Sequence, residues 1–244
     1  MKVCLILLFS IFFSGFICGK ENEVRLSERV FSVSLSASRI IYNLGGLGKS
    51  LLVENNQAYP ILVQSSVYSE DIKNDSGFTV TPPLTKVDSL KTLRLRILDV
   101  KGDYPQDRES LKWLCVKGVP PTNDSIWSDN KNKTSGVDVL SMVSAATCIK
   151  IFIRPPMLQG LDSLQPEKVS WHAIKNKLMI KNDSPFYLNI INVEVAGKKI
   201  NFPKPVPPYS KTEHLLPALK SDLVRWQVIT DLGGESALFE SVVK

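Results

Sequence analysis

Histidine is scarce in this sequence of 244 residues, which holds only His172 and His214. Neither stands at a metal-ligand spacing from another histidine or from a cysteine. The sequence also contains no nucleophile elbow of the kind that positions a catalytic serine. These absences argue against an enzyme, and we expect no catalytic residue, no metal site and no cofactor.

Long basic runs are absent as well. The net charge is +6 and the pI is about 9.1, but lysine and arginine are scattered and do not alternate with aromatic residues as they do at nucleic-acid interfaces. Residues 43–50 read NLGGLGKS, yet a phosphate-binding loop would need glycine in place of Asn43. We therefore expect neither nucleic acid nor ATP as a partner.

The first 19 residues have the pattern of a secretory signal peptide. Lys2 precedes an almost wholly apolar run, residues 3–13, which is too short to span a bilayer comfortably, and small residues follow it. The sequence thus predicts a signal peptide at residues 1–19, cleavage near Gly19, and export of the mature chain.

Cysteine is rare too. Cys4 and Cys18 lie in the expected signal peptide, so the mature chain keeps only Cys115 and Cys148. Two cysteines in an oxidising compartment have one intramolecular partner choice, and the bridge would stabilise the fold by about 3–4 kcal/mol in the chain-entropy model. The alternative is a pair of reduced cysteines in the core.

No sustained helical periodicity is present. Short alternating segments separated by turns rich in glycine, proline, asparagine and aspartate predict an all-β fold. The expected strands of the first half are residues 23–42, 51–54, 61–68, 78–81, 90–98 and 110–117. Those of the second half are residues 169–171, 177–181, 186–195, 199–202, 210–216, 224–230 and 237–242. Residues 120–136 read as a long polar loop with Trp127 as its large apolar anchor.

Between the two halves, the segment from Val137 to Pro156 reads as one unusually long strand. Its apolar residues share one parity and so one face; they are Val137, Val139, Val143, Ile149, Ile151 and Ile153. The segment exceeds the usual strand of about 5–6 residues and is too apolar to lie uncovered at a sheet edge. It is either a buried core strand or a strand that a partner covers.

Seven stretches of the sequence together resemble one known family. They are SRIIY (38–42), AYPILVQSSVY (58–68), VTPPL (80–84), PQDRESLKWLCVKGVPP (105–121), CIKIFIRPP (148–156), NDSPFYLNI (182–190) and WQVITDLGG (226–234). In this order they are similar to the periplasmic chaperones of the chaperone–usher pathway, and specifically to the long-loop subfamily typified by the F1 capsule antigen chaperone.

The resemblance implies a fold and a function. The fold is two immunoglobulin-like β-sandwich domains joined at an angle with a cleft between them, at residues 20–157 and 158–244. The function is that of a periplasmic chaperone, which binds fibre or fimbrial subunits by donor-strand complementation, a form of strand addition, and delivers them to an outer-membrane usher. The free protein could self-associate through exposed strands. The alternative function is a secreted immunoglobulin-like adhesion or binding module.

The resemblance also implies roles for single residues. Arg39 and Lys150 match a pair that anchors the terminal carboxylate of the subunit, and Cys115 and Cys148 match the bridge of the subfamily. The expected donor residues are Val137, Val139, Ser141, Val143 and Ala145. The charges expected to link the two domains are Glu109, Arg154 and Asp231.

Two features depart from a simple donor strand. Ser141 and Ala145 are small or polar where large apolar donors are expected. Leu140 and Met142 on the other parity are therefore either alternative donors or residues that pack inside the chaperone. The first strand also has a donor role in the subfamily. Its apolar residues are expected either to contact the subunit or to form a half-buried core strand; they are Phe31, Val33 and Leu35.

Overall fold

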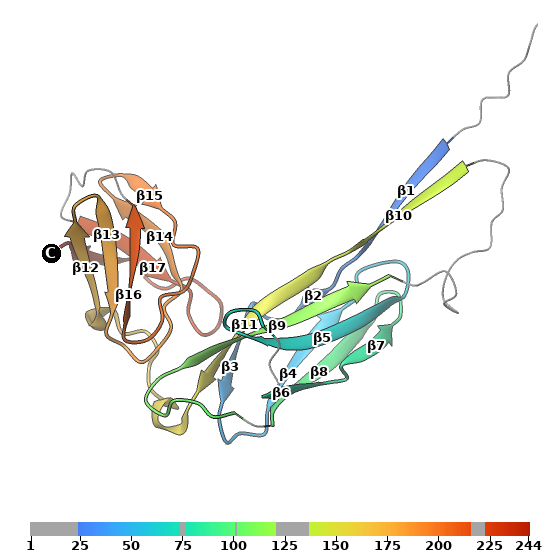
Figure 1. Ribbon diagram of the computed structural model, residues 1–244, viewed down its shortest axis with the longest axis horizontal. Helices are drawn as coiled ribbons and strands as arrows, with labels where there is room; N and C mark the ends of the chain where they lie inside the picture. Colours follow the sequence, from blue (N-terminus) through green and yellow to red (C-terminus); the bar gives the residue numbers. More distant parts are fainter. Residues whose placement is uncertain (1–23, 74–76, 101, 121–136, 216–222) are drawn as a thin grey trace, which may run out of the picture.

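The computed structural model describes residues 24–244 except 74–76, 101, 121–136 and 216–222. The expected signal peptide and nearly all of the expected loop with Trp127 lie outside these residues. The regular structure that is described is strand, apart from two short 3-10 helices, η1 (Pro156–Leu158) and η2 (Pro166–Lys168), between the two domains. Figure 1 shows two β domains set at an angle, so the expected fold class is confirmed.

The first domain packs a four-stranded sheet, β2-β4-β8-β6, against a five-stranded sheet, β3-β11-β9-β5-β7. Its strands are β1 (Val24–Phe31), β2 (Ser34–Leu35), β3 (Arg39–Asn43), β4 (Lys49–Glu54), β5 (Ile61–Ser69), β6 (Phe78–Thr81), β7 (Leu84–Val87), β8 (Thr92–Asp99), β9 (Ser110–Val119), β10 (Val137–Ser144) and β11 (Ala146–Arg154). Alternate residues enter the core, as Ile151 and Ile153 of β11 do. β7 was not among the expected strands.

The second domain packs a three-stranded sheet, β12-β13-β16, against a four-stranded sheet, β15-β14-β17-β18. Its strands are β12 (Val169–Ile174), β13 (Lys177–Asn182), β14 (Ile190–Val195), β15 (Lys198–Ile200), β16 (Ser210–Leu215), β17 (Leu223–Val228) and β18 (Phe239–Val242). Trp171 and Trp226 are buried in its core with ring centroids 6.0 Å apart. The core is separate from that of the first domain.

One expected strand of the second domain, residues 186–195, begins later than expected, at Ile190. The Asn182 side chain accepts from the N–H of Ser184 (2.9 Å) and donates to the carbonyl of Phe186 (2.8 Å). Such a side-chain-capped turn competes with strand pairing, which explains the delayed start.

The expectation of a single strand from Val137 to Pro156 is wrong. β11 has partners on both sides in the five-stranded sheet, whereas β10 leaves that sheet and pairs in parallel with β1 alone. Between them, Ala145 donates its N–H to the carbonyl of Phe31 (3.0 Å) and accepts the N–H of Gly118 (3.0 Å). The chain thus changes partners at Ala145, and β1 and β10 form a two-stranded ribbon that extends beyond the domain (Figure 1).

Gly118 lies where this ribbon leaves the domain. A Cβ atom on Gly118 would collide with the backbone carbonyl of Phe31. The hydroxyl of Ser144 also donates to the Gly118 carbonyl (2.6 Å). Glycine is therefore required at this crossing, because only its bare backbone lets β1 pass so close to β9.

We expect Gly118→Ala to lower the free energy of unfolding by about 1–3 kcal/mol, the usual cost of overpacking. Urea unfolding followed by tryptophan fluorescence measures this change. Gly234→Ala is the matched control, since its added Cβ would meet only the Thr230 hydroxyl at 4.0 Å. Equal stability of the two variants would contradict the required close approach.

Candidate functional site

Arg39 and Lys150 lie side by side on the first domain. β3 pairs in parallel with β11, and the Cα partner of Lys150 is Arg39, so both side chains leave the same face of the sheet. The Nη1 atom of Arg39 donates to the carbonyl of Ile229 in the second domain (3.0 Å), and its guanidinium carbon lies 5.6 Å from the ring centroid of Phe152. The Nζ atom of Lys150 lies 5.3 Å from the ring centroid of Trp113.

Both cations are poorly compensated. Burial, and then the charge of Arg39, lowers the pKa of Lys150. Burial also lowers the pKa of Arg39, although Asp231 and Glu109 act to raise it. In the part of the chain that the structure describes, neither cation forms an ion pair, and the Nε atom of Arg39 is buried without a hydrogen-bond partner. Such a pair of half-buried cations is suited to a carboxylate, which both of them could bind by charge-assisted hydrogen bonds.

A cavity of about 270 Å³ opens beside Arg39 between the two domains. Phe152 and Leu232 provide apolar walls, and Leu232 is 98% exposed. Tyr187 forms a further wall, with its ring centroid 5.8 Å from that of Phe152 and its hydroxyl donating to Oε2 of Glu70 (3.0 Å). Burial raises the pKa of Tyr187. Glu109 and Asp231 also line this cavity, so apolar walls and acidic groups lie together beside Arg39.

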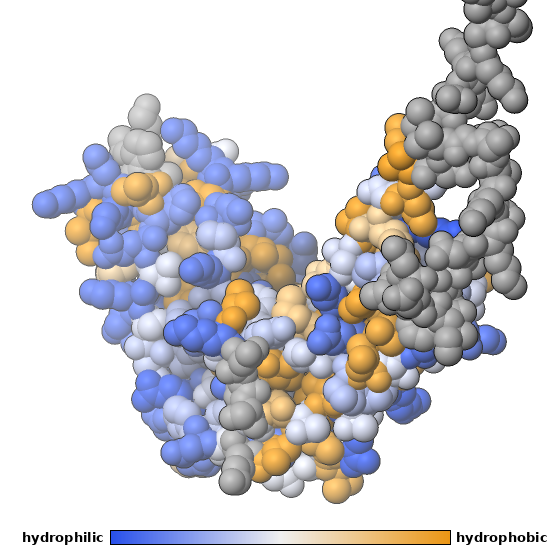
Figure 2. All heavy atoms as spheres, turned by 45° about the vertical axis from the view of Figure 1, so that its right-hand side comes forward, coloured by the Kyte–Doolittle hydropathy of each residue, from blue (hydrophilic) through white to orange (hydrophobic). Residues whose placement is uncertain are grey.

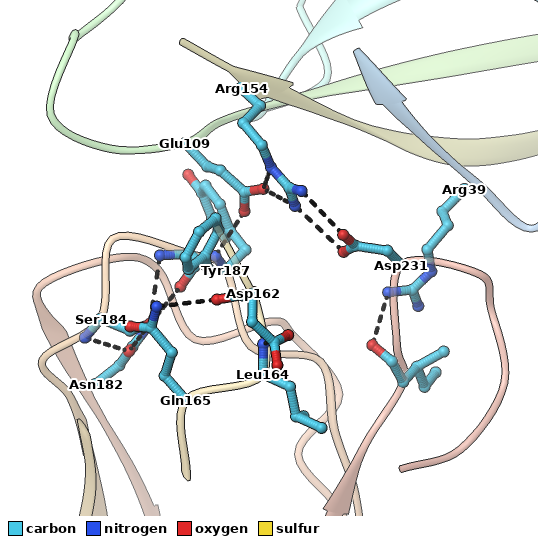
Figure 3. Close-up of polar contacts among 12 residues, drawn as sticks. Arg39, Glu109, Arg154, Asp162, Leu164, Gln165, Asn182, Ser184, Tyr187 and Asp231 are labelled. Carbon is cyan, nitrogen blue, oxygen red and sulfur yellow. Dashed lines mark hydrogen bonds and ion pairs between the residues drawn. The ribbon is translucent and has the colours of Figure 1, made fainter. Parts of the chain in front are cut away.

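Arg154 connects the two domains at the base of this cleft (Figure 3). Its Nε and Nη2 atoms donate to Oε1 of Glu109 at 3.0 and 2.7 Å. Its Nη1 and Nη2 atoms donate to the two carboxylate oxygens of Asp231 in the second domain at 2.9 and 3.2 Å. Oε2 of Glu109 accepts the backbone N–H of Tyr187, also in the second domain (2.9 Å). The structure thus brings together the three expected interdomain charges.

This network is deeply buried on the side of the first domain. Arg154 is 6% exposed and Glu109 is 4% exposed. Burial raises the pKa of Glu109, against the opposing charge of Arg154. Burial acts to lower the pKa of Arg154, but the hydrogen bonds to Asp231 and the charge of Glu109 outweigh it, and the pKa is raised overall. Each charge is tolerated in the interior because its partner is present.

The β1–β10 ribbon carries exposed apolar side chains far from any core (Figures 1 and 2). Those of the expected donor strand include Val139 and Val143, which are 43% and 41% exposed. Leu26 of β1 is 80% exposed. These exposures exclude the buried-core interpretation for this part of the segment. The side chain of Val137 lies outside the description, and Ala145 lies at the break between β10 and β11.

The two faces of the ribbon differ in their surroundings. On one face, Phe31 enters the core, and the guanidinium carbon of Arg29 lies 5.3 Å from the ring centroid of Tyr59. This face therefore looks toward the domain, and the register places Leu140 and Met142 on it, beside Ser27 and Arg29. The opposite, outward face holds Val139, Ser141 and Val143. The expected donors lie on the outward face, whereas the alternative donors Leu140 and Met142, which are 45% and 39% exposed, lie on the face toward the domain.

Phe31 and Val33 are not exposed contacts in this structure. They are 1% and 8% exposed and belong to the core of the first domain, while Leu35 packs against that core. This corrects the expectation of subunit contact for Phe31 and Val33 and favours the alternative of a core strand. Ala145 and Gly118 draw the chain into the domain here, so the free apolar residues of the first strand lie earlier, at Leu26 and Val30.

The expected disulfide between Cys115 and Cys148 is confirmed. The two residues are direct partners in the antiparallel pairing of β9 with β11. The same register places Trp113 beside Lys150, a contact that the sequence analysis missed. The contact could have been predicted from the disulfide. If the two cysteines face each other on antiparallel strands, the residue two positions before Cys115 faces the residue two positions after Cys148. Tyr187 was missed as well, and its sequence context offers no comparable signal.

No group of side chains suited to a metal ion occurs among the described residues. A search of the same residues also finds no helix that is long and apolar enough to cross a membrane.

We expect Arg154→Ala to lower the free energy of unfolding by about 3–5 kcal/mol, because Glu109 would lose its counter-ion while buried. The raised pKa of Glu109 sets the pH dependence. A carboxyl whose pKa is raised in the folded state destabilises that state once the pH exceeds its pKa in the unfolded chain. The variant should therefore lose more unfolding free energy at pH 8 than near pH 5. Chemical unfolding at both pH values measures it, and adding Glu109→Gln should recover part of it. A pH-independent loss would mean that Glu109 is not an unpaired charge in the variant.

Comparison with known proteins shows which family the chain belongs to. Residues 32–159 match the family described as pili and flagellar-assembly chaperone, PapD N-terminal domain, and residues 164–240 match pili assembly chaperone PapD, C-terminal domain. The chain is 40% identical to Chaperone protein AggD of Escherichia coli over 90% of its own length and 88% of that protein. It is 38% identical to Chaperone protein caf1M of Yersinia pestis over 91% and 90%.

Solved structures agree with the sequence comparisons. The E. coli chaperone DraB is 41% identical with a TM-score of 0.77, and the similarity covers 90% of this chain and 100% of that one. The structure of the Salmonella enterica SafA pilin in complex with the SafB chaperone matches at 37% identity, also with a TM-score of 0.77 and the same coverage. The chain therefore belongs to the PapD family of pili assembly chaperones.

Proposed function

We propose that this protein is a periplasmic chaperone that binds newly exported fibre or pilus subunits by donor-strand complementation and delivers them to an outer-membrane usher. The observation that carries the proposal is the β1–β10 ribbon, whose apolar side chains and strand edges have no partner in the described part of the domain. An exposed apolar strand pair is a template for strand addition. A subunit that lacks one strand of its sandwich would supply the missing cover.

The cation pair provides the second half of the proposal. Arg39 and Lys150 bind the terminal carboxylate of the subunit, and the apolar walls of the neighbouring cavity receive the last side chains. Fixing the chain end sets the register of the subunit along β11 and β10. Register decides which side chains enter the groove, because a slip of one residue turns every side chain to the opposite face.

Several further expectations belong to this proposal. The pattern at residues 1–19 supports export, and the family match supports a role in assembly rather than catalysis. Release of the subunit would occur by exchange of one donor strand for another, with no ATP, no cofactor and no nucleic acid involved. The same exposed ribbon would let the free protein self-associate. The alternative of an adhesion module gives no reason for the buried cation pair.

We expect Arg39→Ala and Lys150→Ala each to weaken subunit binding by about 1.5–3 kcal/mol, the usual contribution of a hydrogen bond to a charged group. The test is periplasmic co-expression with the exported subunit encoded beside the chaperone gene, followed by purification of the soluble one-to-one complex and measurement of its stability. Lys117→Ala is the matched control, an exposed cation on the neighbouring strand β9. Capture by Lys150→Ala as strong as that by the control would overturn the assignment of the anchor.

A further inference from the structure

The outward face of the ribbon is not uniformly apolar. The parallel register of β1 with β10 arranges its described side chains in three rows across the ribbon, which are Leu26 with Val139, Glu28 with Ser141, and Val30 with Val143. The outer two rows are wholly apolar and the middle row is wholly polar. Ser141, which is too polar for a simple donor residue, therefore lies directly beside a carboxylate.

Glu28 has no partner of its own to explain this position. Its side chain is exposed, and it forms no hydrogen bond or ion pair with any residue in the described ranges. Arg29, its neighbour in sequence, points to the other face, toward the ring of Tyr59. The carboxylate is thus presented to whatever covers the outward face.

We infer that Glu28 is a specificity residue that recognises a lysine or an arginine in the groove of the subunit. This inference rests on the proposed function and names a property of the client, since a subunit with a wholly apolar groove would fit this ribbon poorly. An ionised carboxylate that enters such a groove unpaired loses its hydration without compensation.

The polar row also marks the register. A slip of two residues keeps the same face toward the subunit but moves Glu28 against the place of Leu26 or Val30, where an apolar pocket would meet the charge. Lys150 and Arg39 set the register at the other side of the break at Ala145, where β10 and β11 have different partners. The row of Glu28 and Ser141 adds a second reference point, within the ribbon itself, to the register that the anchored chain end sets.

The hydroxyl of Ser141 fits this role because it both donates and accepts. Next to Glu28 it can donate to the carboxylate or accept from the same groove residue, at little steric cost. A large apolar residue in its place would cover the carboxylate and separate it from a partner. The two residues therefore act together, with Glu28 supplying the charge and Ser141 the space and a second polar atom.

The test measures complexes with the exported subunit encoded beside the chaperone gene, formed by periplasmic co-expression. We expect Glu28→Gln and Glu28→Leu to weaken the complex at least about tenfold, as for loss of one partner of a desolvated charge pair. Glu54→Gln, a change of an exposed carboxylate at the end of β4, is the matched control and should leave the affinity unchanged. Thermal unfolding of the free variants should also be unchanged, since Glu28 supports no contact in the chaperone.

A charge swap identifies the partner. In Glu28→Lys, binding should be lost, and replacing the groove lysine or arginine of the subunit by glutamate should restore it. Wild-type affinity or tighter binding in Glu28→Leu would overturn the inference while leaving the proposed function intact. Failure of the wild-type protein to bind the subunit at all would instead reject the proposed function, and the inference with it.

Discussion

The parallel pairing of β3 with β11 is the constraint on which the site depends. Because side chains of paired residues in a sheet leave the same face, this single register brings Arg39 of the first strand region to Lys150, more than a hundred positions later in the chain. Burial and the charge of Arg39 lower the pKa of Lys150, whereas Asp231 and Glu109 act to raise the pKa of Arg39. Neither cation forms an ion pair among the described residues. The ring of Phe152 beneath Arg39 and the ring of Trp113 beneath Lys150 moderate the repulsion without neutralising either charge. The site is thus held ready for an anion.

The second domain covers the Arg39 side of the cation pair. The carbonyl of Ile229 accepts from Arg39, and the cavity beside it is walled partly by residues of the second domain. Arg154, which joins Glu109 and Asp231 at the base of the cleft, is one of several contacts between the domains, together with the bond from the Tyr187 N–H to Glu109. A buried ion pair adds little net stability compared with a well-packed apolar core, but it has a defined geometry. Here the geometry sets the angle between two domains whose cores are separate.

Unlike this buried network, the ribbon exposes its apolar side chains, so they contribute little to the stability of the chaperone itself. Proteins usually shield exposed strand edges with charges, bulges or short strands. In this ribbon Glu28 and Ser141 interrupt the apolar rows, and the outward face combines large apolar residues with a carboxylate. The protein therefore presents a surface that is completed only in a complex, and the polar row limits which complex is formed.

The sequence by itself determined the all-β class, most strand positions, the pairing of Cys115 with Cys148 and, through the family resemblance, the residues Arg39, Lys150, Glu109, Arg154 and Asp231. The alternation of side chains can be seen within each segment, which shows the strands. The mature chain has only two cysteines, which leaves one possible intramolecular bridge. Given that bridge, the neighbourhood of Trp113 and Lys150 also followed. Only the tertiary structure decided that the long segment breaks at Ala145, that Phe31 and Val33 lie in the core, and that Glu28 stands beside Ser141. These outcomes depend on which strand pairs with which and on the close crossing at Gly118, and backbone pairing between distant segments leaves no periodic signal in either one.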